Sequence, residues 1–203
     1  MRAGVRDERI FRAVAAVLLV SALSISGYHR HKAERAGEAR SPAWREEGLP
    51  VAVGLRSAGL ALMLSVAAYV LSPRRMEWSR LDLSSWLRWS GAGLGAASLP
   101  LAHWVFSSIG ENITPTVTTR RDHELVTDGL YRWVRHLLYS VGSTFWVSLS
   151  LLAANWFMGL ASVAVLVMVL VRLPKEEARL IERFGDEYSA YTERTGRLLP
   201  RLR

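Results

Sequence analysis

The sequence predicts an all-α, polytopic membrane protein: a helix bundle with five transmembrane helices and a C-terminal helix on the cytoplasmic interface. Half of the 203 residues are apolar, and they form long blocks, unlike the core of a soluble protein. Five blocks have the length, about 17 to 25 residues, that crosses a hydrocarbon core of about 30 Å. These blocks are residues 10–27, 49–71, 86–109, 137–154 and 156–173.

The first block follows a short arginine-rich segment, a pattern shared by transmembrane helices and secretory signals. A cleaved signal would leave the basic loop 28–48 outside, against the usual excess of positive charge on the cytoplasmic side. We therefore expect residues 10–27 to form the first transmembrane helix.

In the second and third blocks, Arg56 and His103 are ionisable side chains in or near lipid depth, where charge is costly. Arg56 could snorkel to the headgroups or line a pocket, and His103 could pack or take a functional part. Gly91 and Gly95 imitate a nucleotide-binding glycine loop, but such a loop needs a preceding strand and a following helix. Inside an apolar block, glycines four residues apart indicate the close approach of two helices.

The last two blocks are separated only around Asn155, which predicts a tight helical hairpin. Pro174 removes a backbone donor and disfavours helix at Leu173, so we expect the hairpin's second helix to end or kink there. From Glu176 to Tyr191, charged and apolar residues alternate at helical spacing, which predicts an amphipathic helix lying on the interface.

Basic residues in the loops predict an orientation. With five spans, one side of the membrane carries six of them, namely Arg2, Arg6, Arg9, Arg74, Arg75 and Arg80. The other side carries sixteen, namely Arg30, Lys32, Arg35, Arg40, Arg45, Arg120, Arg121, Arg132, Arg135, Lys175, Arg179, Arg183, Arg194, Arg197, Arg201 and Arg203. The more positive side faces the cytoplasm, which places the amino terminus outside.

The formal net charge of +8 does not predict a nucleic-acid partner. The basic residues flank the apolar blocks, where such residues meet the anionic headgroups of membrane lipids. Cysteine is absent, which leaves neither thiolate chemistry nor a disulfide frame. The five histidines form no cluster with cysteine or paired carboxylates, so we expect no metal site.

Polar residues bracket the hairpin on its predicted cytoplasmic side. Before it stand residues 123–131, His-Glu-Leu-Val-Thr-Asp-Gly-Leu-Tyr, and residues 135–139, Arg-His-Leu-Leu-Tyr. After it stand Arg172 and the pair Glu176 and Glu177, beside the membrane, where a charge requires a partner. With an odd number of spans, both polar segments lie on one membrane face and can build a single site.

The segment before the hairpin has a structural explanation as well. Arg132, Arg135 or His136 and Tyr139 share one face of a helix that starts near Leu130. Alone, this face would equally fit a basic, aromatic belt at the membrane entry.

In its last 80 or so residues the chain resembles the isoprenylcysteine carboxyl methyltransferase family. The order and near-matching spacing of the motif residues carry the resemblance: residues 123–127, Gly129, Tyr131, Arg135, His136, Tyr139, Arg172, Glu176, Glu177, Phe184, Gly185, Tyr188, Tyr191 and Pro200. Three positions depart from the pattern, since Leu130 and Leu137 replace prolines and Val141 replaces a glycine. The departures indicate a reshaped pocket or an altered substrate, because proline supplies rigidity and glycine supplies room.

The resemblance implies an integral-membrane methyltransferase that uses S-adenosyl-L-methionine at the cytoplasmic face and methylates a lipophilic small-molecule or lipidated acceptor, most readily its carboxylate. It implies catalytic roles for Arg172, which would hold the acceptor, and Glu176. The cofactor site that it implies consists of His123, Glu124, Leu125, Val126, Tyr131, Arg135, His136, Leu137, Leu138, Tyr139, Glu176 and Glu177. Residues 1–203 would form one domain, with three motif-poor spans in 1–109 and a catalytic region in 110–203 built around the hairpin 137–173.

Other functions stay open at this point. A phospholipid N-methyltransferase or a small-thiol S-methyltransferase would use the same donor, although an amine acceptor must first lose a proton to a base such as Glu176 or Glu177. A non-catalytic membrane scaffold is a further alternative. A carrier is disfavoured, because the spans show neither mid-bilayer polar residues nor a repeated half.

Overall fold

The computed structural model describes residues 5–35, 48–109 and 125–201, and these residues contain helices and two isolated β-bridges but no strand. The predicted all-α class is therefore confirmed for this part of the chain. The helices are α1 Val5–Arg35, α3 Leu49–Leu71, the 3-10 helix η1 Pro73–Ser79, α4 Ser85–Ile109, the 3-10 helix η3 Gly129–Arg132, α5 Leu137–Ala153, α6 Trp156–Phe184 and α7 Asp186–Arg194.

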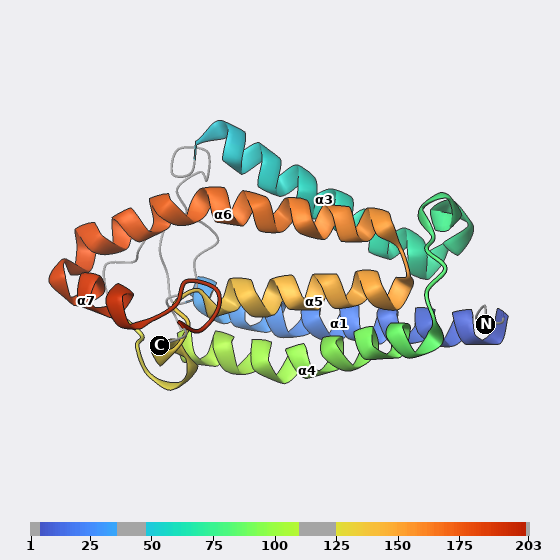
Figure 1. Cartoon of the computed structure of the whole chain (residues 1–203), viewed down its shortest axis with the longest axis horizontal. Coiled ribbons are helices and arrows are strands. Elements are labelled where there is room, and N and C mark those ends of the chain that lie inside the picture. The colour runs from blue at the N-terminus through green and yellow to red at the C-terminus, as the bar shows by residue number, and fades with distance from the viewer. Residues whose placement is uncertain (1–4, 36–47, 110–124, 202–203) are drawn as a thin grey trace.

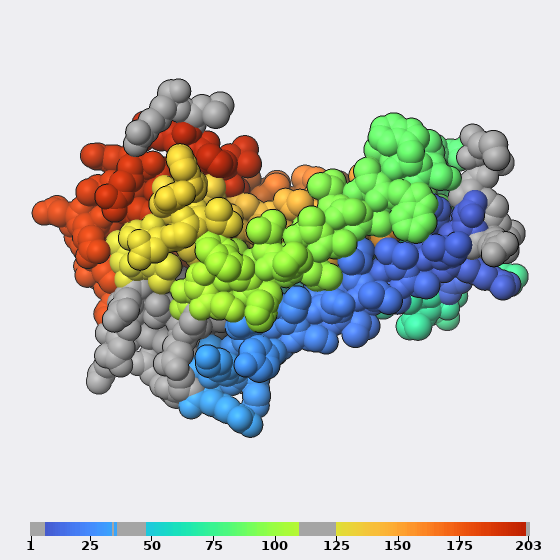
Figure 2. Space-filling view, turned by 90° about the horizontal axis from the view of Figure 1, so that it is seen from below, coloured from blue at the N-terminus to red at the C-terminus, as the bar shows by residue number. Residues whose placement is uncertain are grey.

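The long helices run side by side in two layers (Figure 1). One layer contains α1, α4 and α5, and the other contains α3 and α6. Figure 2 shows α1 and α4 lying against each other along one face of the molecule. Between the layers lies a core with fully buried side chains from four helices, including Phe11, Leu62, Leu149 and Met158. In lipid, such contacts stabilise the bundle through close packing, because the surrounding lipid tails are as apolar as the side chains.

The α4–α5 contact depends on two glycines. A Cβ atom at Gly91 would lie 2.8 Å from the backbone of Ser148 and Leu152, and one at Gly95 would lie 2.8 Å from Ser148 Oγ. No side chain fits at these distances without separating the helices. The prediction that these glycines serve helix packing is confirmed.

The hairpin between α5 and α6 is also confirmed, and a cap explains its sharpness. Ala154 ends α5 in the left-handed region with φ 51°. The Asn155 side chain then accepts a hydrogen bond from Met158 N at 3.0 Å and so caps α6. Its amide nitrogen donates to Ser79 Oγ at 2.7 Å, which ties the turn to η1.

Of the two alternatives expected at Pro174, an end or a kink of the helix, the end is wrong. Helix α6 continues through Pro174 to Phe184, and its 29 residues span about 43 Å, more than a hydrocarbon core. Figure 1 shows the last turns of α6 curving toward the α4–α5 layer, the bend that a proline inside a helix produces. The single amphipathic helix expected from Glu176 is instead divided at Gly185 between the end of α6 and α7.

Three helices of the described residues are both long and apolar enough to cross a membrane: the segment Asp7–Ala33 of α1, then α3 and α6. Helix α5 is apolar but has only 17 residues. Helix α4 has 25 residues and carries the buried Arg88 in its first turn. The protein is thus an integral-membrane helical bundle, and the predicted count of five spans rests on α4 and α5.

A polar network closes the end of the bundle where the turn between α5 and α6 lies. The buried Arg88 donates to Leu152 O at 2.8 Å, to both carboxylate oxygens of Glu8 at 2.8 and 3.2 Å and to Tyr69 Oη at 3.0 Å. Tyr69 in turn donates to Glu8 at 2.9 Å, and the Arg88 guanidinium lies 3.9 Å from the Phe11 ring centroid. These contacts join α1, α3, α4 and α5. Helix α1 is therefore a member of the bundle, as expected of a transmembrane helix.

Candidate functional site

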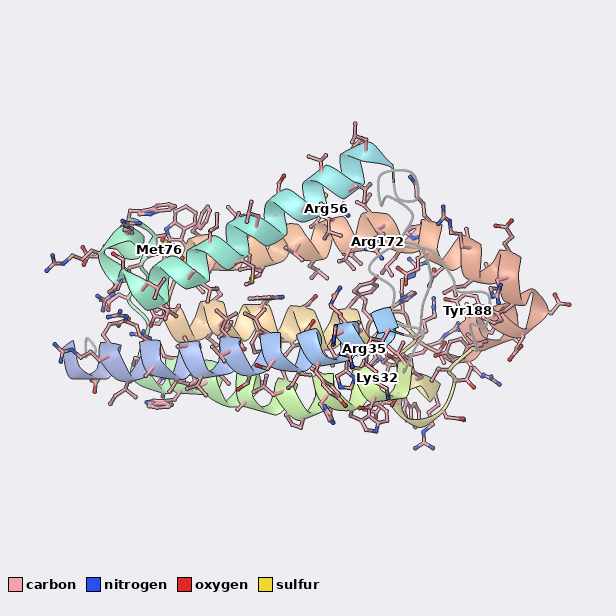
Figure 3. The ribbon with its side chains drawn as sticks, turned by 180° about the vertical axis from the view of Figure 1, so that it is seen from behind. Lys32, Arg35, Arg56, Met76, Arg172 and Tyr188 are labelled. Carbon is pink, nitrogen blue, oxygen red and sulfur yellow. The ribbon has the colours of Figure 1, made fainter. Side chains whose placement is uncertain are left out.

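Charged side chains from three segments meet at the opposite end of the bundle. The segments are residues 131–139, the bent end of α6 and the tail 195–198. Figure 2 shows the region 125–140 packed against the C-terminal residues, and Figure 3 shows Arg172 and Tyr188 at this end, far from Met76. The two polar segments that bracket the hairpin therefore meet at one end of the bundle, as a shared site requires.

Glu176 lies between the two halves of the predicted site. Tyr139 Oη donates to Glu176 Oε2 at 2.9 Å, and Arg172 Nε lies 3.7 Å from the same oxygen. His136 Nδ1 lies 3.9 Å from Glu176 Oε1. The side chain of Glu176 is 22% exposed, so this carboxylate is accessible at the edge of the cluster.

Glu177, the next residue, is buried and surrounded by cationic groups. Arg135 Nε donates to Glu177 Oε1 at 2.7 Å, and His136 Nε2 lies 3.2 Å from the same oxygen. Arg197 forms hydrogen bonds and an ion pair with both oxygens. The two adjacent glutamates therefore differ: Glu177 is enclosed by its partners, whereas Glu176 is partly open.

Aromatic rings stack beside these charges. The His136 and Tyr139 rings lie 5.9 Å apart with an interplanar angle of 22°. The buried Arg172 guanidinium lies 5.9 Å from the Tyr139 ring centroid, within the range of a cation–π interaction. Tyr139 thus contacts Arg172 with its ring and Glu176 with its hydroxyl.

The tail after α7 completes the cluster through backbone pairing. Arg135 N and His136 N donate to Gly196 O and Arg197 O at 3.0 and 3.1 Å, and Gly196 N donates to Trp133 O at 3.0 Å. The side chain of Arg135 also donates to Thr195 O at 2.7 Å. This pairing satisfies two backbone donors immediately before α5, which have no partner within that helix. It also fixes Arg197 beside Glu177.

Three tyrosines near the cluster remain protonated at neutral pH. Burial raises the pKa of Tyr191 to about 12 and raises the pKa of Tyr131 and Tyr188 further. Tyr191 donates to Tyr131 O at 2.6 Å. In contrast, the hydroxyls of Tyr131 and Tyr188 are buried and have no hydrogen-bond partner among the described residues.

The structure divides the residues that the sequence singled out. It brings together Arg135, His136, Tyr139, Arg172, Glu176 and Glu177. Four others, Val126, Tyr131, Leu137 and Leu138, form an apolar cluster with Val105 of α4 next to the charged groups. Leu125 is half-buried at the start of this segment. His123 and Glu124 lie outside the described residues.

Two of the positions that depart from the family pattern have a structural role. Leu137 begins α5, a first helical position where proline is also favoured, so either residue suits the backbone. Val141 is buried against Val105 and Tyr131 and fills space that a glycine would leave open.

The remaining candidate residues lie apart from the charged cluster. Arg56 is exposed on α3 and donates to Ala52 O of its own helix at 3.0 Å. His103 Nδ1 lies 3.2 Å from Nε2 of the buried His29 in α1. Arg132 is exposed and lies over the Trp133 ring at 5.3 Å rather than joining the face of Tyr139. Within the described residues no group of three or more histidine, aspartate or glutamate side chains could hold a metal ion.

Sequence reasoning missed three important residues. In the sequence, Arg197 is only one of the charges of the tail, Tyr188 is a motif residue with no role assigned to it, and Arg88 has no evident role in its span. Only the depth of Arg88 in an apolar block could have drawn attention to it. The surroundings of Arg197 and Tyr188 follow from tertiary contacts.

The fold and the cluster define an integral-membrane helical protein with a compact site of arginines, paired glutamates and aromatic rings at one end of the bundle. Residues 94–182 match the sequence profile of the Isoprenylcysteine carboxyl methyltransferase (ICMT) family. The matched segment includes the motif residues from His123 to Glu177, so the resemblance to this family that the sequence predicted is confirmed for this part of the chain.

Relatives with established names agree with this similarity. The chain is 30% identical over 127 residues to the human Protein-S-isoprenylcysteine O-methyltransferase, covering 61% of this chain and 44% of the human protein. It is 35% identical over 95 residues to the Schizosaccharomyces pombe enzyme of the same name, covering 45% of this chain and 40% of that protein. The chain thus spans less than half the length of these two relatives. With Protein-S-isoprenylcysteine O-methyltransferase B of Arabidopsis thaliana it shares 29% identity over 139 residues, 66% of this chain and 69% of the relative.

A solved structure has a similar fold. The structure of the eukaryotic intramembrane Ras methyltransferase ICMT without a monobody superposes with a TM-score of 0.53 at 20% identity, over 73% of this chain and 51% of that one. At this identity the similarity establishes the helical fold alone.

Proposed function

We propose that the protein is an S-adenosyl-L-methionine-dependent methyltransferase that methylates the carboxylate of a lipophilic acceptor, as an isoprenylcysteine carboxyl O-methyltransferase does. The observation that carries this proposal is Arg172. Its guanidinium is buried at the end of the apolar part of α6, beside Tyr139 and Glu176. A buried arginine next to lipid is suited to hold the anionic end of a lipophilic molecule, because its planar fork matches a carboxylate.

The residues of the cluster fit the proposed donor. S-adenosyl-L-methionine carries a sulfonium and an ammonium, and Glu176 is a partly exposed carboxylate beside the ring of Tyr139. The unpartnered hydroxyls of Tyr131 and Tyr188 supply buried polar groups for a ligand. When bound, the donor would supply a methyl group from its sulfonium: the acceptor oxygen would bond to the methyl carbon in line as the carbon–sulfur bond breaks, and S-adenosylhomocysteine would leave.

The chain's own residues would position the reactants and exclude water. Glu176 would bind the cationic end of the donor, and Arg172 would orient the acceptor carboxylate. No general base is needed, since a free α-carboxyl with a reference pKa of about 3.5 is ionised at neutral pH. The proposed donor site comprises His123, Glu124, Leu125, Val126, Tyr131, Arg135, His136, Leu137, Leu138, Tyr139, Glu176 and Glu177.

Within this site we assign Glu177 a positioning role. Its carboxylate is taken up by Arg135, His136 and Arg197. It would therefore hold these side chains in place while Glu176 contacts the donor directly.

We also propose a single membrane domain with five crossings, with the site facing the cytoplasm and the amino terminus outside. Helices α4 and α5 run alongside α1 in Figure 1, which supports their crossing the same bilayer. Exposed tryptophans, the residue type of membrane interfaces, lie toward both ends of the bundle, with Trp78, Trp86 and Trp156 at one end and Trp104 and Trp133 at the other. The site end carries the larger share of loop arginines.

The lipophilic acceptor would enter sideways between helices, and residues 110–203 would form the catalytic region.

The proposal is tested with purified protein in lipid nanodiscs. Calorimetry first measures binding of S-adenosylhomocysteine, the demethylated form of the donor. Methyl-labelled donor is then supplied with an S-farnesylcysteine derivative, and we expect label in a base-labile ester. The matched control is the same acceptor with a carboxamide in place of its carboxyl group, which should remain unlabelled.

Two outcomes would contradict the proposal. Absence of S-adenosylhomocysteine binding would remove every methyltransferase function and leave a scaffold. Base-stable label on phosphatidylethanolamine, with a rate that climbs as the amine loses its proton, would show N-methylation instead. A carboxylate acceptor should give a rate that does not depend on its own ionisation above about pH 5.

A further inference from the structure

Tyr188, on α7, has a buried hydroxyl group that no other described residue contacts by a hydrogen bond. The residue is 1% exposed, and its hydroxyl has no hydrogen-bond partner within the described part of the chain. The ring is held in place by Tyr191, with ring centroids 5.9 Å apart and planes at 60°. An unsatisfied buried hydroxyl costs about 1 to 3 kcal/mol, so its retention calls for an explanation.

The neighbouring Tyr191 shows that this part of the fold can satisfy a buried phenol. Three residues further along the same helix, its hydroxyl donates to Tyr131 O at 2.6 Å. The two tyrosines are equally buried, at 1% and 2% exposure. Burial therefore does not explain why the Tyr191 hydroxyl has a hydrogen-bond partner and the Tyr188 hydroxyl has none among the described residues. Of the two hydroxyls, the one of Tyr188 is left to bind a ligand.

The surroundings of Tyr188 indicate which ligand group it would meet. Its phenol interacts electrostatically with Glu177, Arg135 and Glu176. Figure 3 places it at the end of the bundle that holds Arg172. Arg135 already donates to Glu177 and to Thr195 O. A neutral hydroxyl donor therefore lies near the same charged cluster as the carboxylate that we assign to the donor's ammonium.

We propose that the Tyr188 hydroxyl donates a hydrogen bond to the α-carboxylate of the bound methyl donor. The inference rests on the proposed function and names one more binding residue for it. In an amino acid the ammonium and the carboxylate are attached to one carbon atom. A site that binds the ammonium through Glu176 therefore needs a hydrogen-bond donor close by, and Tyr188 supplies it.

The test compares Tyr188→Phe with the unaltered protein by calorimetry, with S-adenosylhomocysteine and its decarboxylated analogue as probes. A hydrogen bond to a charged group is worth about 1.5 to 3 kcal/mol, so we expect affinity for S-adenosylhomocysteine to fall by about tenfold or more. Affinity for the decarboxylated analogue should stay within about twofold. The thermal midpoint of the ligand-free variant should remain the same or rise, because the substitution removes an unsatisfied polar group.

Tyr191→Phe is the matched control. It removes a hydroxyl that has a partner, so it should lower the thermal midpoint without distinguishing the two probes. Equal weakening of both probes by Tyr188→Phe, or unchanged binding of both, would overturn the inference while leaving the proposed function intact. Failure of the unaltered protein to bind either probe would overturn both proposals.

Discussion

The two ends of the bundle each bury an arginine–carboxylate network, but the two networks differ in how completely they are satisfied. At the end near the α5–α6 turn, every guanidinium nitrogen of Arg88 donates a hydrogen bond, and the Tyr69 hydroxyl both donates and accepts. At the other end, Glu177 is enclosed by its partners, whereas the hydroxyls of Tyr131 and Tyr188 have none among the described residues.

This difference separates structural from functional charge. A buried ion pair alone does not show whether a network stabilises the fold or binds a ligand, because burying charge is costly in both cases and a buried pair requires further hydrogen bonds. A complete network leaves nothing for a ligand to bind. A network with accessible or unpartnered groups, such as Glu176 and Tyr188, has binding capacity left over.

The largest expected effect concerns catalysis. Arg172→Ala should reduce turnover by at least about 100-fold, the loss seen when one group that stabilises charge is removed. Affinity for S-adenosylhomocysteine should stay within a few-fold, because Arg172 is assigned to the acceptor. Arg172→Lys keeps the positive charge but lacks the planar guanidinium, so its turnover should lie between that of the unaltered protein and that of Arg172→Ala. Steady-state rates and calorimetry on the same preparations test this, and a parallel loss of rate and donor affinity would contradict the assignment.

The second prediction compares the adjacent glutamates. Glu177→Gln leaves Arg135 and Arg197 without their carboxylate and should lower the free energy of unfolding by about 3 kcal/mol, as breaking one side of a buried pair does. Glu176→Gln should cost less stability but weaken donor binding more, because its side chain is 22% exposed. Denaturation in detergent and calorimetry measure the two quantities. If the two variants lost equal amounts of stability and of donor affinity, the assignment of Glu177 to positioning and of Glu176 to donor binding would be wrong.

The third prediction concerns the other end. Arg88→Ala leaves Leu152 O without its side-chain donor and leaves Glu8 with the hydrogen bond from Tyr69 but without its buried cation. The change should cost about 2 to 3 kcal/mol of stability. Affinity for S-adenosylhomocysteine should be unaffected. The control is Arg80→Ala, since Arg80 is 48% exposed and lies 3.9 Å from Glu8, and an exposed pair contributes about 0 to 1 kcal/mol. A loss of donor affinity in Arg88→Ala beyond that in Arg80→Ala would show that the two ends are coupled.

The smallest effect should appear at alkaline pH. Burial raises the pKa of Tyr191 from about 10 to about 12, so the folded state holds its proton where the unfolded chain loses it. Stability from this group is complete below pH 10 and declines as the pH rises toward 12. Thermal midpoints between pH 8 and 12 should fall less steeply for Tyr191→Phe than for the unaltered protein. Identical slopes would show that other groups control alkaline unfolding.

Much of the fold could be predicted because lipid imposes simple constraints on sequence. Apolar blocks of spanning length predicted the helices, and the residues around Asn155 predicted the hairpin, since backbone groups in a bilayer must be bonded within helices. The end of α6 could not be predicted in this way. Pro174 disfavours helix locally, yet Arg172 and Glu177 on either side have partners in the folded chain that keep the helix continuous.

The candidate site, like the fold, could be predicted from the sequence only in part. The ordered motif residues indicated which side chains belong together, but not how Glu176 and Glu177 would differ. That difference depends on Arg197, which lies 20 residues further along the chain and reaches Glu177 through the pairing of the tail with residues 133–136. A local pattern carries no information about such a contact.

By itself, the sequence determined that this chain forms apolar helices and that arginines, glutamates and aromatic residues flank the last hairpin, because periodicity and block length are local properties. Only the tertiary structure decided which carboxylate is enclosed, which hydroxyl has no partner and which network is complete. These properties depend on atoms from segments far apart in the chain, whose distances are fixed only when the helices pack together.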